Sequence, residues 1–431
     1  MASLPLPDYD SQRWSGKEPN RDEAIRSLRL LNDAAQKINS ILDLDKLVDK
    51  IVNEVAVAFQ CSLSGILLKD EQTGDLVPAA CARGIGYRSS RYRIGKDGMV
   101  GHAAALGHTY YAPDVRQDPY YIACVEDTLS EVDIPLKIGD ELIGVFSAQQ
   151  PRVNGFSRAQ LQLLEALAEH IAIAVQNARL FRRERREKEE ARAIQRALLP
   201  QSMPEVPGFL IDGDCVTAGA VGGDWYDFVP LRSARRHRPL WGLVLGDVCG
   251  KGMAAALLMC SARSLLRSVL NSYTSPSTVL ARLNRILLDD MPRERFVSMV
   301  FAVLDASART LTFANAGHPW PIYSDGQHTD FLKTEAGLPL GIADGEYDEQ
   351  VVHLSEDARV VLYTDGVTDA GDSGGEEYGE QRLREHLARP DVSSRRILQE
   401  VSNFCGGVPL SDDATAIVLR SEEQPQLRLG F

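Results

Sequence analysis

The sequence has little that would tie it to nucleic acid or to a membrane. Its 431 residues hold 47 Lys and Arg against 60 Asp and Glu, a net charge of -13, so no basic excess is available for phosphate backbones or anionic lipids. No apolar run of about 18 residues occurs, and the first 20 residues lack the apolar core of a signal peptide. We therefore expect a cytoplasmic protein with no nucleic-acid partner and no membrane.

Cysteine is scarce and shows no pattern. The seven cysteines are scattered, with no Cys-x-x-Cys pair and no Cys/His spacing of a zinc site, so reduced and mostly buried thiols are expected. Aromatic residues make up only 7%, but 44% hydrophobic and 25% charged residues are typical of globular proteins. A chain of this length predicts two or three domains.

Hydrophobic patterns divide the chain into segments. Short strand patterns, a glycine-opened helix and a β-hairpin predict an α/β domain first. Further on, strands bounded by glycine and aspartate are interrupted twice by pairs of helical patterns, which predicts an α+β sandwich of two stacked sheets covered by helices. The expected segments are a disordered N-terminus at 1–20, a helix at 21–40, the first domain at 41–180, the second domain at 200–421 and a tail at 422–431.

A long helical pattern connects the two domains. Residues 157–199 contain no glycine or proline, and apolar residues recur three and four apart before a strongly charged stretch. This predicts one continuous helix that ends before Pro200. Its coiled-coil-like seam predicts a parallel homodimer.

The first domain resembles a GAF domain, a small sensory α/β module. The segments that carry the resemblance are "GMVGHAAALGHTYYAPDVRQDPYY", the hairpin "IPLKIGDELIGVFSAQQ" and the closing helix "FSRAQLQLLEALAEHIAIAVQNARLF". An unrelated α/β scaffold with the same element order is the alternative. The resemblance implies a small-molecule ligand. His102, His108 and Cys124 could line a pocket, but their spacing shows no logic and favours ordinary core and surface residues.

Aspartates stand beside apolar strands at four places in the second domain. One such acid can cap a helix or a turn, but four strand ends are harder to explain in that way. Clustered carboxylates repel each other unless a cation compensates. Oxygen ligands without a nearby His or Cys set favour Mg²⁺ or Mn²⁺, and a pair of such ions suits the hydrolysis of a phosphate ester. The acids are Asp224, Asp227, Asp247, Asp365, Asp369, Asp412 and Asp413.

The same residues resemble the metal-dependent protein phosphatases (PPM, protein phosphatase 2C-like) of the bacterial stress-response and sporulation branch. Seven motifs occur in order from Ala193 to Arg420: "QRALLP", "GGDWYDF", "GDVCGKGMAAALLM", "NAGHPWPI", "GLPLGI", "LYTDGVTDA" and "DDATAIVL". The resemblance implies an α-β-β-α sandwich that hydrolyses phosphoserine or phosphothreonine on a regulatory protein. An anti-anti-sigma (STAS) protein is the implied substrate, and its dephosphorylation would release a sigma factor.

The resemblance also implies a role for each acid. Asp247 matches the aspartate that bridges two metal ions, and the carbonyl of Val248 matches the adjoining ligand. Asp365 and Asp412 match ligands of the other ion, and Asp224 matches an acid that reaches the metal through water. The implied catalytic residues are Asp224, Asp247, Asp365 and Asp412, and the implied metal site adds Val248 and Asp413. The roles of Asp413 and Asp227 stay open.

The sequence departs from eukaryotic relatives after the bridging aspartate. The motif "DVCGKG" offers Cys249 and Lys251 where those relatives have a histidine, so the general acid is unassigned. His318 in "NAGHPWP" is either a structural or a substrate-facing residue. The helix after this motif, with the next one, matches a regulatory switch of the family. A Walker A loop is excluded, since Leu245 replaces its first glycine and Gly252 its hydroxyl residue.

Two other functions compete with a GAF-regulated phosphatase. The stretch "VGGDWYDF" superficially resembles the GGDEF hairpin of diguanylate cyclases, but Trp225 replaces the acid and the later motifs have no place in that fold. A degenerate phosphatase that serves as a binding module is the second alternative. It is disfavoured because every metal-ligand position is occupied.

Overall fold

The computed structural model describes residues 43–82, 91–231, 240–335 and 337–422. The chain divides into two compact units, residues 1–186 and 187–431. The segments expected at 1–20 and 21–40, and all but the first residue of the expected tail at 422–431, lie outside the described residues. Each unit is described by itself below.

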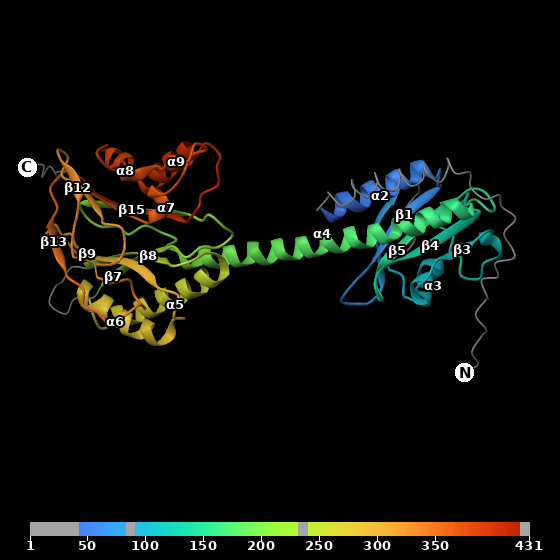
Figure 1. Cartoon of the computed structure of the whole chain (residues 1–431), viewed down its shortest axis with the longest axis horizontal. Helices are drawn as coiled ribbons and strands as arrows, with labels where there is room; N and C mark the ends of the chain where they lie inside the picture. The colour runs from blue at the N-terminus through green and yellow to red at the C-terminus, as the bar shows by residue number, and fades with distance from the viewer. Residues whose placement is uncertain (1–42, 83–90, 232–239, 336, 423–431) are drawn as a thin grey trace, which may run out of the picture. The chain divides into compact units, whose positions relative to one another are not determined.

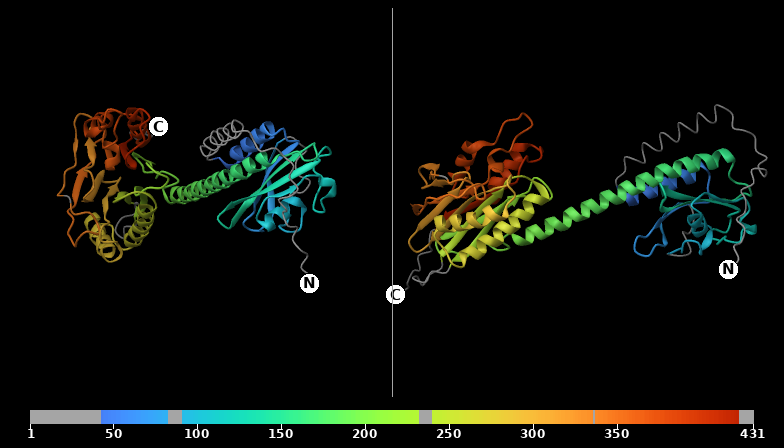
Figure 2. Two further views of the ribbon diagram at one scale, coloured as in Figure 1. Left: turned by 45° about the vertical axis from the view of Figure 1, so that its right-hand side comes forward. Right: turned by 60° about the horizontal axis from the view of Figure 1, so that its bottom comes forward.

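The N-terminal unit is one antiparallel sheet with helices on both faces (Figures 1 and 2). The strand order is β2-β1-β5-β4-β3. Helix α2 and the first part of α4 form a core with one face, while α3 packs on β4 and β5 from the other. The elements are α2 (Leu44–Ala58), β1 (Leu63–Lys69), β2 (Leu76–Ala82), α3 (Gly98–Leu106), β3 (Tyr110–Ala112), the 3-10 turn η1 (Val115–Gln117), β4 (Ser130–Ile138) and β5 (Glu141–Gln150).

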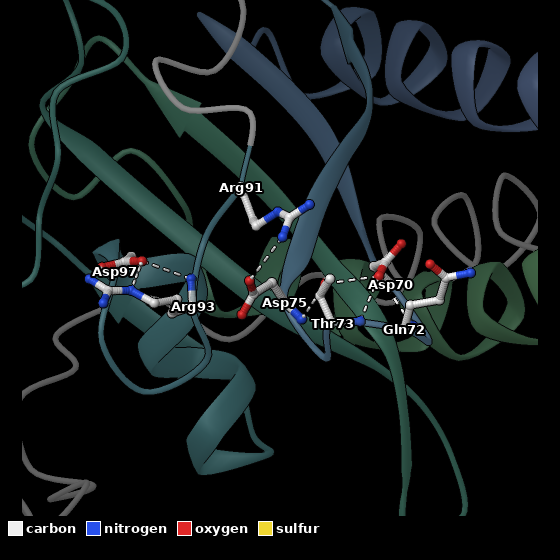
Figure 3. A network of polar contacts seen from close by, with 7 residues as sticks. All are labelled: Asp70, Gln72, Thr73, Asp75, Arg91, Arg93 and Asp97. Atoms are coloured by element: carbon white, nitrogen blue, oxygen red, sulfur yellow. Dashed lines mark hydrogen bonds and ion pairs between the residues drawn. The ribbon is translucent and has the colours of Figure 1, made fainter.

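Local polar contacts hold the turns of this unit (Figure 3). In the β1–β2 turn, Asp70 Oδ1 accepts hydrogen bonds from the amide and the hydroxyl of Thr73, both at 2.8 Å. Ahead of α3, Arg93 Nε lies 2.9 Å from Asp97 Oδ2. Because these groups are exposed, they define the path of the loops and add little to stability.

Helix α4 covers Arg158–Leu198, 41 residues without a break, against the range 157–199 expected from the sequence. Its early residues Leu164, Ile171 and Ala178 are buried in the core of the N-terminal unit. Near its other end, Gln195 is buried in the C-terminal unit, where it donates to Gly222 O at 2.7 Å and accepts from Gly222 N at 3.1 Å. The helix therefore contributes core residues to both units.

The C-terminal unit consists of four layers, with two antiparallel sheets between helices (Figure 1). The sheet orders are β13-β10-β9-β8-β7 and β12-β11-β14-β15-β6. Helices α5 and α6 cover the first sheet, and α7, α8 and α9 cover the second. Its strands are β6 (Phe209–Val216), β7 (Trp225–Leu231), β8 (Leu240–Val248), β9 (Val297–Asp305), β10 (Thr310–Ala316), β11 (Ile322–Ser324), β12 (Thr329–Phe331), β13 (Gln350–His353), β14 (Arg359–Tyr363) and β15 (Ala414–Ser421). Its helices are α5 (Gly252–Leu270), α6 (Pro276–Asp290), α7 (Asp365–Thr368), α8 (Gly379–Leu387) and α9 (Ser394–Cys405).

Alternation along the strands explains these layers. On β7, Tyr226 and Phe228 enter the core between the two sheets, whereas Trp225 lies under α5 and α6. The ring of Trp225 fits because Gly246 is its cross-strand partner, and a Cβ at Gly246 would lie 2.5 Å from that ring. Small and large residues thus pair across β7 and β8.

Helix α5 combines length with an apolar composition. Within the described part of the chain, it is the one helix long and apolar enough to pass as a membrane span by those two criteria. In the structure it packs on the first sheet, with Ala255, Met259, Ala262 and Leu266 fully or almost fully buried. Its apolar face is accounted for by that core.

None of the seven cysteines, all of which lie in described segments, forms a disulfide. Cys61 and Cys405 are buried, and the other five are half-buried. The expectation of thiols without disulfides fits this distribution. Burial is less complete than the composition suggested.

Candidate active site

The four acidic motifs meet at one end of the sandwich. Asp224 directly precedes β7 and Asp247 lies near the end of β8, two neighbouring strands in which Trp225 pairs with Gly246. On the second sheet, Asp365 follows β14 and Asp413 precedes β15, which are also neighbours. Antiparallel pairing places the end of one strand beside the start of the next. Each pair of motifs is therefore adjacent within its sheet.

Asp224 connects the two sheets. Its side chain is 3% exposed, and Oδ2 accepts hydrogen bonds from Thr364 Oγ1 at 2.8 Å and Thr415 Oγ1 at 2.6 Å. Burial raises the pKa of Asp224 well above its usual value, and the charge of Asp247 raises it further. Sequence reasoning missed both threonines, although each lies inside an acidic motif, within two residues of its aspartate.

The other acids act on each other electrostatically. Burial and then the charge of Asp365 raise the pKa of Asp247 to about 7. Burial and then the charge of Asp369 raise the pKa of Asp365, with a further contribution from Asp412. These carboxyl groups disfavour one another's ionisation, and a hard divalent cation would compensate their negative charges.

The donor set therefore fits Mg²⁺ or Mn²⁺ in its chemistry. The acids are spaced too widely to hold an ion as they stand: among the described residues, no three His, Cys, Asp or Glu side chains lie close enough together. The Lys251 ammonium lies 3.1 Å from Asp412 Oδ2 and also binds the carbonyl of Ser411. Ion binding would therefore require Asp412 to exchange this cation for another.

Asp413, whose role the sequence left open, has a structural role. It is buried, and its two oxygens accept from the amides of Ala218 and Gly223, each at 2.8 Å. A Cβ on Gly222 would overlap Asp413 Oδ2. Position 222 therefore has no room for a residue larger than glycine, and Asp413 fixes the loop that leads into Asp224.

Replacing Gly222 with alanine tests this packing. We expect Gly222→Ala to lower the free energy of unfolding of the C-terminal unit by about 1–3 kcal/mol, because the new methyl group overpacks a buried carboxylate. The matched control is Gly219→Ala, where a Cβ would meet only Val221 O at 3.4 Å. Urea unfolding midpoints measure the difference. Equal midpoints for the two variants would contradict the packing argument.

Asp227 points away from the acidic cluster. It is fully buried on the helix-facing side of β7, where Arg267 of α5 donates from Nε to Oδ2 at 2.7 Å and from Nη2 to Oδ1 at 2.8 Å. Arg263 Nε lies 3.2 Å from the same carboxylate. The bidentate pair of Arg267 with Asp227 connects β7 to α5. Both oxygens of Asp227 are engaged there, which answers the question left open by the sequence.

Two cations border the end of β8. Lys251 follows Gly250 and precedes Gly252, whose φ values of +101° and +74° favour glycine at both positions. Arg295 Nη1 donates to the carbonyl of Cys249 at 2.6 Å. Sequence reasoning noticed Lys251 but missed Arg295, because 46 residues separate it from this loop.

His318 has the structural role that was one of its two interpretations. It is buried, Nδ1 lies 2.8 Å from Ser298 Oγ, and its amide donates to Asn315 Oδ1 at 2.7 Å. Burial lowers its pKa to about 3, so the ring is neutral at ordinary pH. A buried neutral imidazole in a turn is poorly placed to face a substrate.

The raised pKa values predict a pH dependence for the metal-free protein. Asp247 has a folded-state pKa of about 7 against its ordinary value of 3.8, so folding favours its protonated form. Its contribution is full below about pH 4 and is lost as pH rises to about 7. With EDTA present, we expect unfolding stability to fall from pH 5 to pH 8 by on the order of 2 kcal/mol more than in Asp247→Asn. Identical pH profiles of unfolding stability for the wild-type protein and Asp247→Asn would contradict this role of Asp247.

Comparison with known proteins identifies the family to which this chain belongs. Residues 239–422 match the family Stage II sporulation protein E (SpoIIE), and residues 41–176 match the GAF domain. Phosphoserine phosphatase RsbU of Bacillus subtilis is 30% identical over 239 residues, which cover 54% of this chain and 70% of RsbU. The chain belongs to the SpoIIE-type PP2C phosphatases. Asp247, Asp365 and Asp412 lie inside the matched range, and Asp224 lies shortly before it.

Two further proteins are similar to this SpoIIE-type phosphatase. Phosphoserine phosphatase RsbP of Bacillus subtilis is 28% identical over 190 residues, 43% of this chain and 46% of RsbP. Among solved structures, the SiaA-PP2C domain of Pseudomonas aeruginosa is 23% identical with a TM-score of 0.47, covering 56% of this chain and 98% of that domain.

Family membership confirms the main sequence predictions. The protein is a serine/threonine protein phosphatase with an N-terminal GAF domain. The fold class, a GAF domain followed by a PP2C-like α-β-β-α sandwich, is also confirmed. Phosphatases of this family are generally dependent on Mn²⁺ or Mg²⁺.

Proposed function

We propose that this SpoIIE-type phosphatase removes phosphate from a phosphoserine or phosphothreonine of a regulatory protein in a reaction that requires two Mn²⁺ or Mg²⁺ ions. The observation that carries the proposal is the acidic cluster at one end of the sandwich, in which Asp247 interacts with the buried Asp224 and with the more accessible Asp365 and Asp412. The chemistry of this cluster fits the activity for which RsbU is named, that of a phosphoserine phosphatase.

The proposed ion ligands are the side chains of Asp247, Asp365 and Asp412 and the carbonyl of Val248, with Asp224 acting through water. When bound, the ions would supply Lewis-acid activation of a water molecule and of the phosphoryl group. Gly223 lets the loop pass the Val248 carbonyl, since a Cβ there would lie 2.6 Å from that oxygen. Asp413 supports the site by holding the Gly223 amide.

Lys251 and Arg295 are proposed to act on the substrate. Both lie at the loop after Asp247, Lys251 beside Asp412 and Arg295 on the carbonyl of Cys249. Their positive charges would orient the non-bridging oxygens of a phosphoryl group and offset the charge that develops on them.

The proposed regulation passes through α4 in a parallel dimer. Four large apolar side chains are exposed on this helix: Ile173, Leu180, Phe181 and Ile194. Three of them, Ile173, Leu180 and Ile194, stand at multiples of seven residues. Such a stripe at heptad spacing is typical of a two-stranded coiled coil. We propose that the GAF domain alters phosphatase activity through this dimeric linker, and that the protein acts in the cytoplasm.

The proposed substrate is a phosphorylated STAS-type anti-anti-sigma protein, as the family resemblance suggests. The test compares phosphate release from a serine-phosphorylated STAS protein and from a generic phosphoserine peptide, with Mn²⁺ and with EDTA. Faster release from the STAS protein supports the proposed substrate, and equal rates would refute it. The absence of release from either substrate would instead support the binding-module alternative. The diguanylate cyclase alternative is ruled out by the family.

A further inference from the structure

Two acidic side chains are buried in the GAF domain, away from the phosphatase chemistry. Glu131 and Asp133 lie on β4 and are 5% and 0% exposed. Val132 and Ile134 alternate with them and enter the core made with α2 and α4. The two acids therefore face the other side of the sheet, the side that α3 covers (Figure 1).

No basic residue compensates these acids within the described part of the chain. Glu131 accepts a long hydrogen bond from Ser147 Oγ at 3.3 Å, and hydrogen bonding to Gln149 and Ser147 lowers its pKa less than burial raises it. Both carboxylate oxygens of Asp133 are buried without a hydrogen-bond partner. Neither acid forms an ion pair with any described residue. A buried carboxylate that lacks a partner is costly, and natural proteins rarely retain one without a reason.

Protonation alone does not resolve this arrangement. Burial raises the pKa of Asp133 to about 7, and burial followed by the charge of Asp133 raises the pKa of Glu131 well above its usual value. A protonated carboxyl group loses its charge but still carries an acceptor oxygen. A protonated Glu131 can donate to Asp133, but a single donor cannot satisfy both buried oxygens of Asp133, which leaves acceptor positions for donors from outside the chain.

The neighbours of the pair favour an organic cation over a metal ion. Cross-strand register places Tyr110 and Ser147 beside Asp133, and Tyr110 donates its hydroxyl hydrogen to Asp118 Oδ2 at 2.8 Å. Tyr120 stacks on the ring of His102 at 3.8 Å between centroids, so the surroundings mix acids with aromatic rings. Among the described residues, no three acidic, His or Cys side chains are grouped as a metal would require.

We propose that the GAF domain binds a small organic molecule through a primary ammonium group, which Glu131 and Asp133 hold between the sheet and α3. An ammonium group offers three donors for the unsatisfied carboxylate oxygens, and its positive charge compensates the pair. The aromatic rings suit the carbon skeleton that carries it. This inference is independent of the proposed phosphatase substrate, because it concerns a different domain.

Hydrogen exchange of the full-length protein tests the proposal. The probe is ethylammonium chloride, compared with sodium chloride at equal ionic strength. We expect ethylammonium to slow exchange in peptides from α3 and β4 by about twofold or more once its concentration reaches the dissociation constant. Asp133→Asn should lose this protection, while Asp140→Asn, a change at an exposed acid of the β4–β5 turn, should keep it.

Each other outcome overturns the proposal. Absence of protection in the wild-type protein up to saturating salt, or equal protection in Asp133→Asn, would remove the ammonium site. Protection by MgCl₂ in place of ethylammonium would assign the pair to a metal ion. If Asp133→Asn does not fold, Glu131→Gln with Glu141→Gln as its exposed control supplies the same comparison.

Discussion

Replacing Asp247 with asparagine is expected to lower Mn²⁺-dependent phosphate release about a thousandfold, equivalent to about 4 kcal/mol of the activation barrier. Asp247 interacts with Asp224, Asp365 and Asp412, and its loss would remove the proposed bridge between the two ions. The measurement is phosphate release from a phosphoprotein under saturating Mn²⁺. Asp290→Asn, at an exposed acid near the end of α6, is the matched control.

The same substitution should leave the metal-free fold intact or more stable. Asp247 is mostly buried among like charges that raise its pKa, so replacing its carboxylate relieves repulsion at neutral pH. Thermal unfolding in EDTA should give an equal or higher midpoint for Asp247→Asn. Full activity in this variant would remove Asp247 from the site. A lower midpoint would mean that it has a structural role instead.

A proline in the exposed part of α4 is expected to disrupt dimerisation and regulation together. Proline in a helix interior costs ~3 kcal/mol or more, and a dimer that depends on this helix would weaken by about a hundredfold. Ala178 is fully buried in the GAF core, so a proline there would also damage that domain. Glu187 is exposed and lies at the heptad position shared by Leu180 and Ile194, so a proline there breaks the helix within the proposed seam without damaging the GAF core.

The experiment compares Glu187→Pro with Glu187→Ala, which keeps the helix. Light scattering measures the mass in solution, and phosphate release measures activity in the same samples. We expect a monomer with altered activity for the proline variant and wild-type behaviour for the alanine variant. If mass and activity are both unchanged in Glu187→Pro, α4 is only a tether between the domains.

The sequence was sufficient for the layers and for the position of the acids. Alternation in "GGDWYDF" correctly separates Trp225 and Asp227 from Tyr226, and glycine beside aspartate marks the strand ends that meet in the cluster. These features are local, since they depend on residues within one strand and its turn. The family motifs then extend the local pattern to the whole sandwich.

The features of the site that the sequence did not predict depend on contacts between residues far apart in the chain. The arginine partners of Asp227 lie on α5, 40 residues further along for Arg267, and Asp413 holds amides almost 200 residues before it. Local patterns contain no information about such partners. An acid that fixes a loop and an acid that binds an ion can therefore look alike in sequence.

The GAF domain shows a second limit of pattern analysis. In "SEVDIPLKI", alternation predicts one apolar and one polar face, and the acids on the polar face would ordinarily be exposed. Here α3 covers that face and buries Glu131 and Asp133. The candidates His102, His108 and Cys124 drew attention by residue type, whereas the unusual feature is a pair of ordinary acids in an unusual environment.

Calorimetric titration of Mn²⁺ into metal-free protein tests the central claim most directly. The claim is that acids from four separate motifs form one two-ion site. We expect two ions per chain for the wild-type protein, and loss of at least one for Asp247→Asn and for Asp365→Asn, with Asp290→Asn unchanged. Absence of Mn²⁺ binding to the wild-type protein, or full binding by both site variants, would contradict the account.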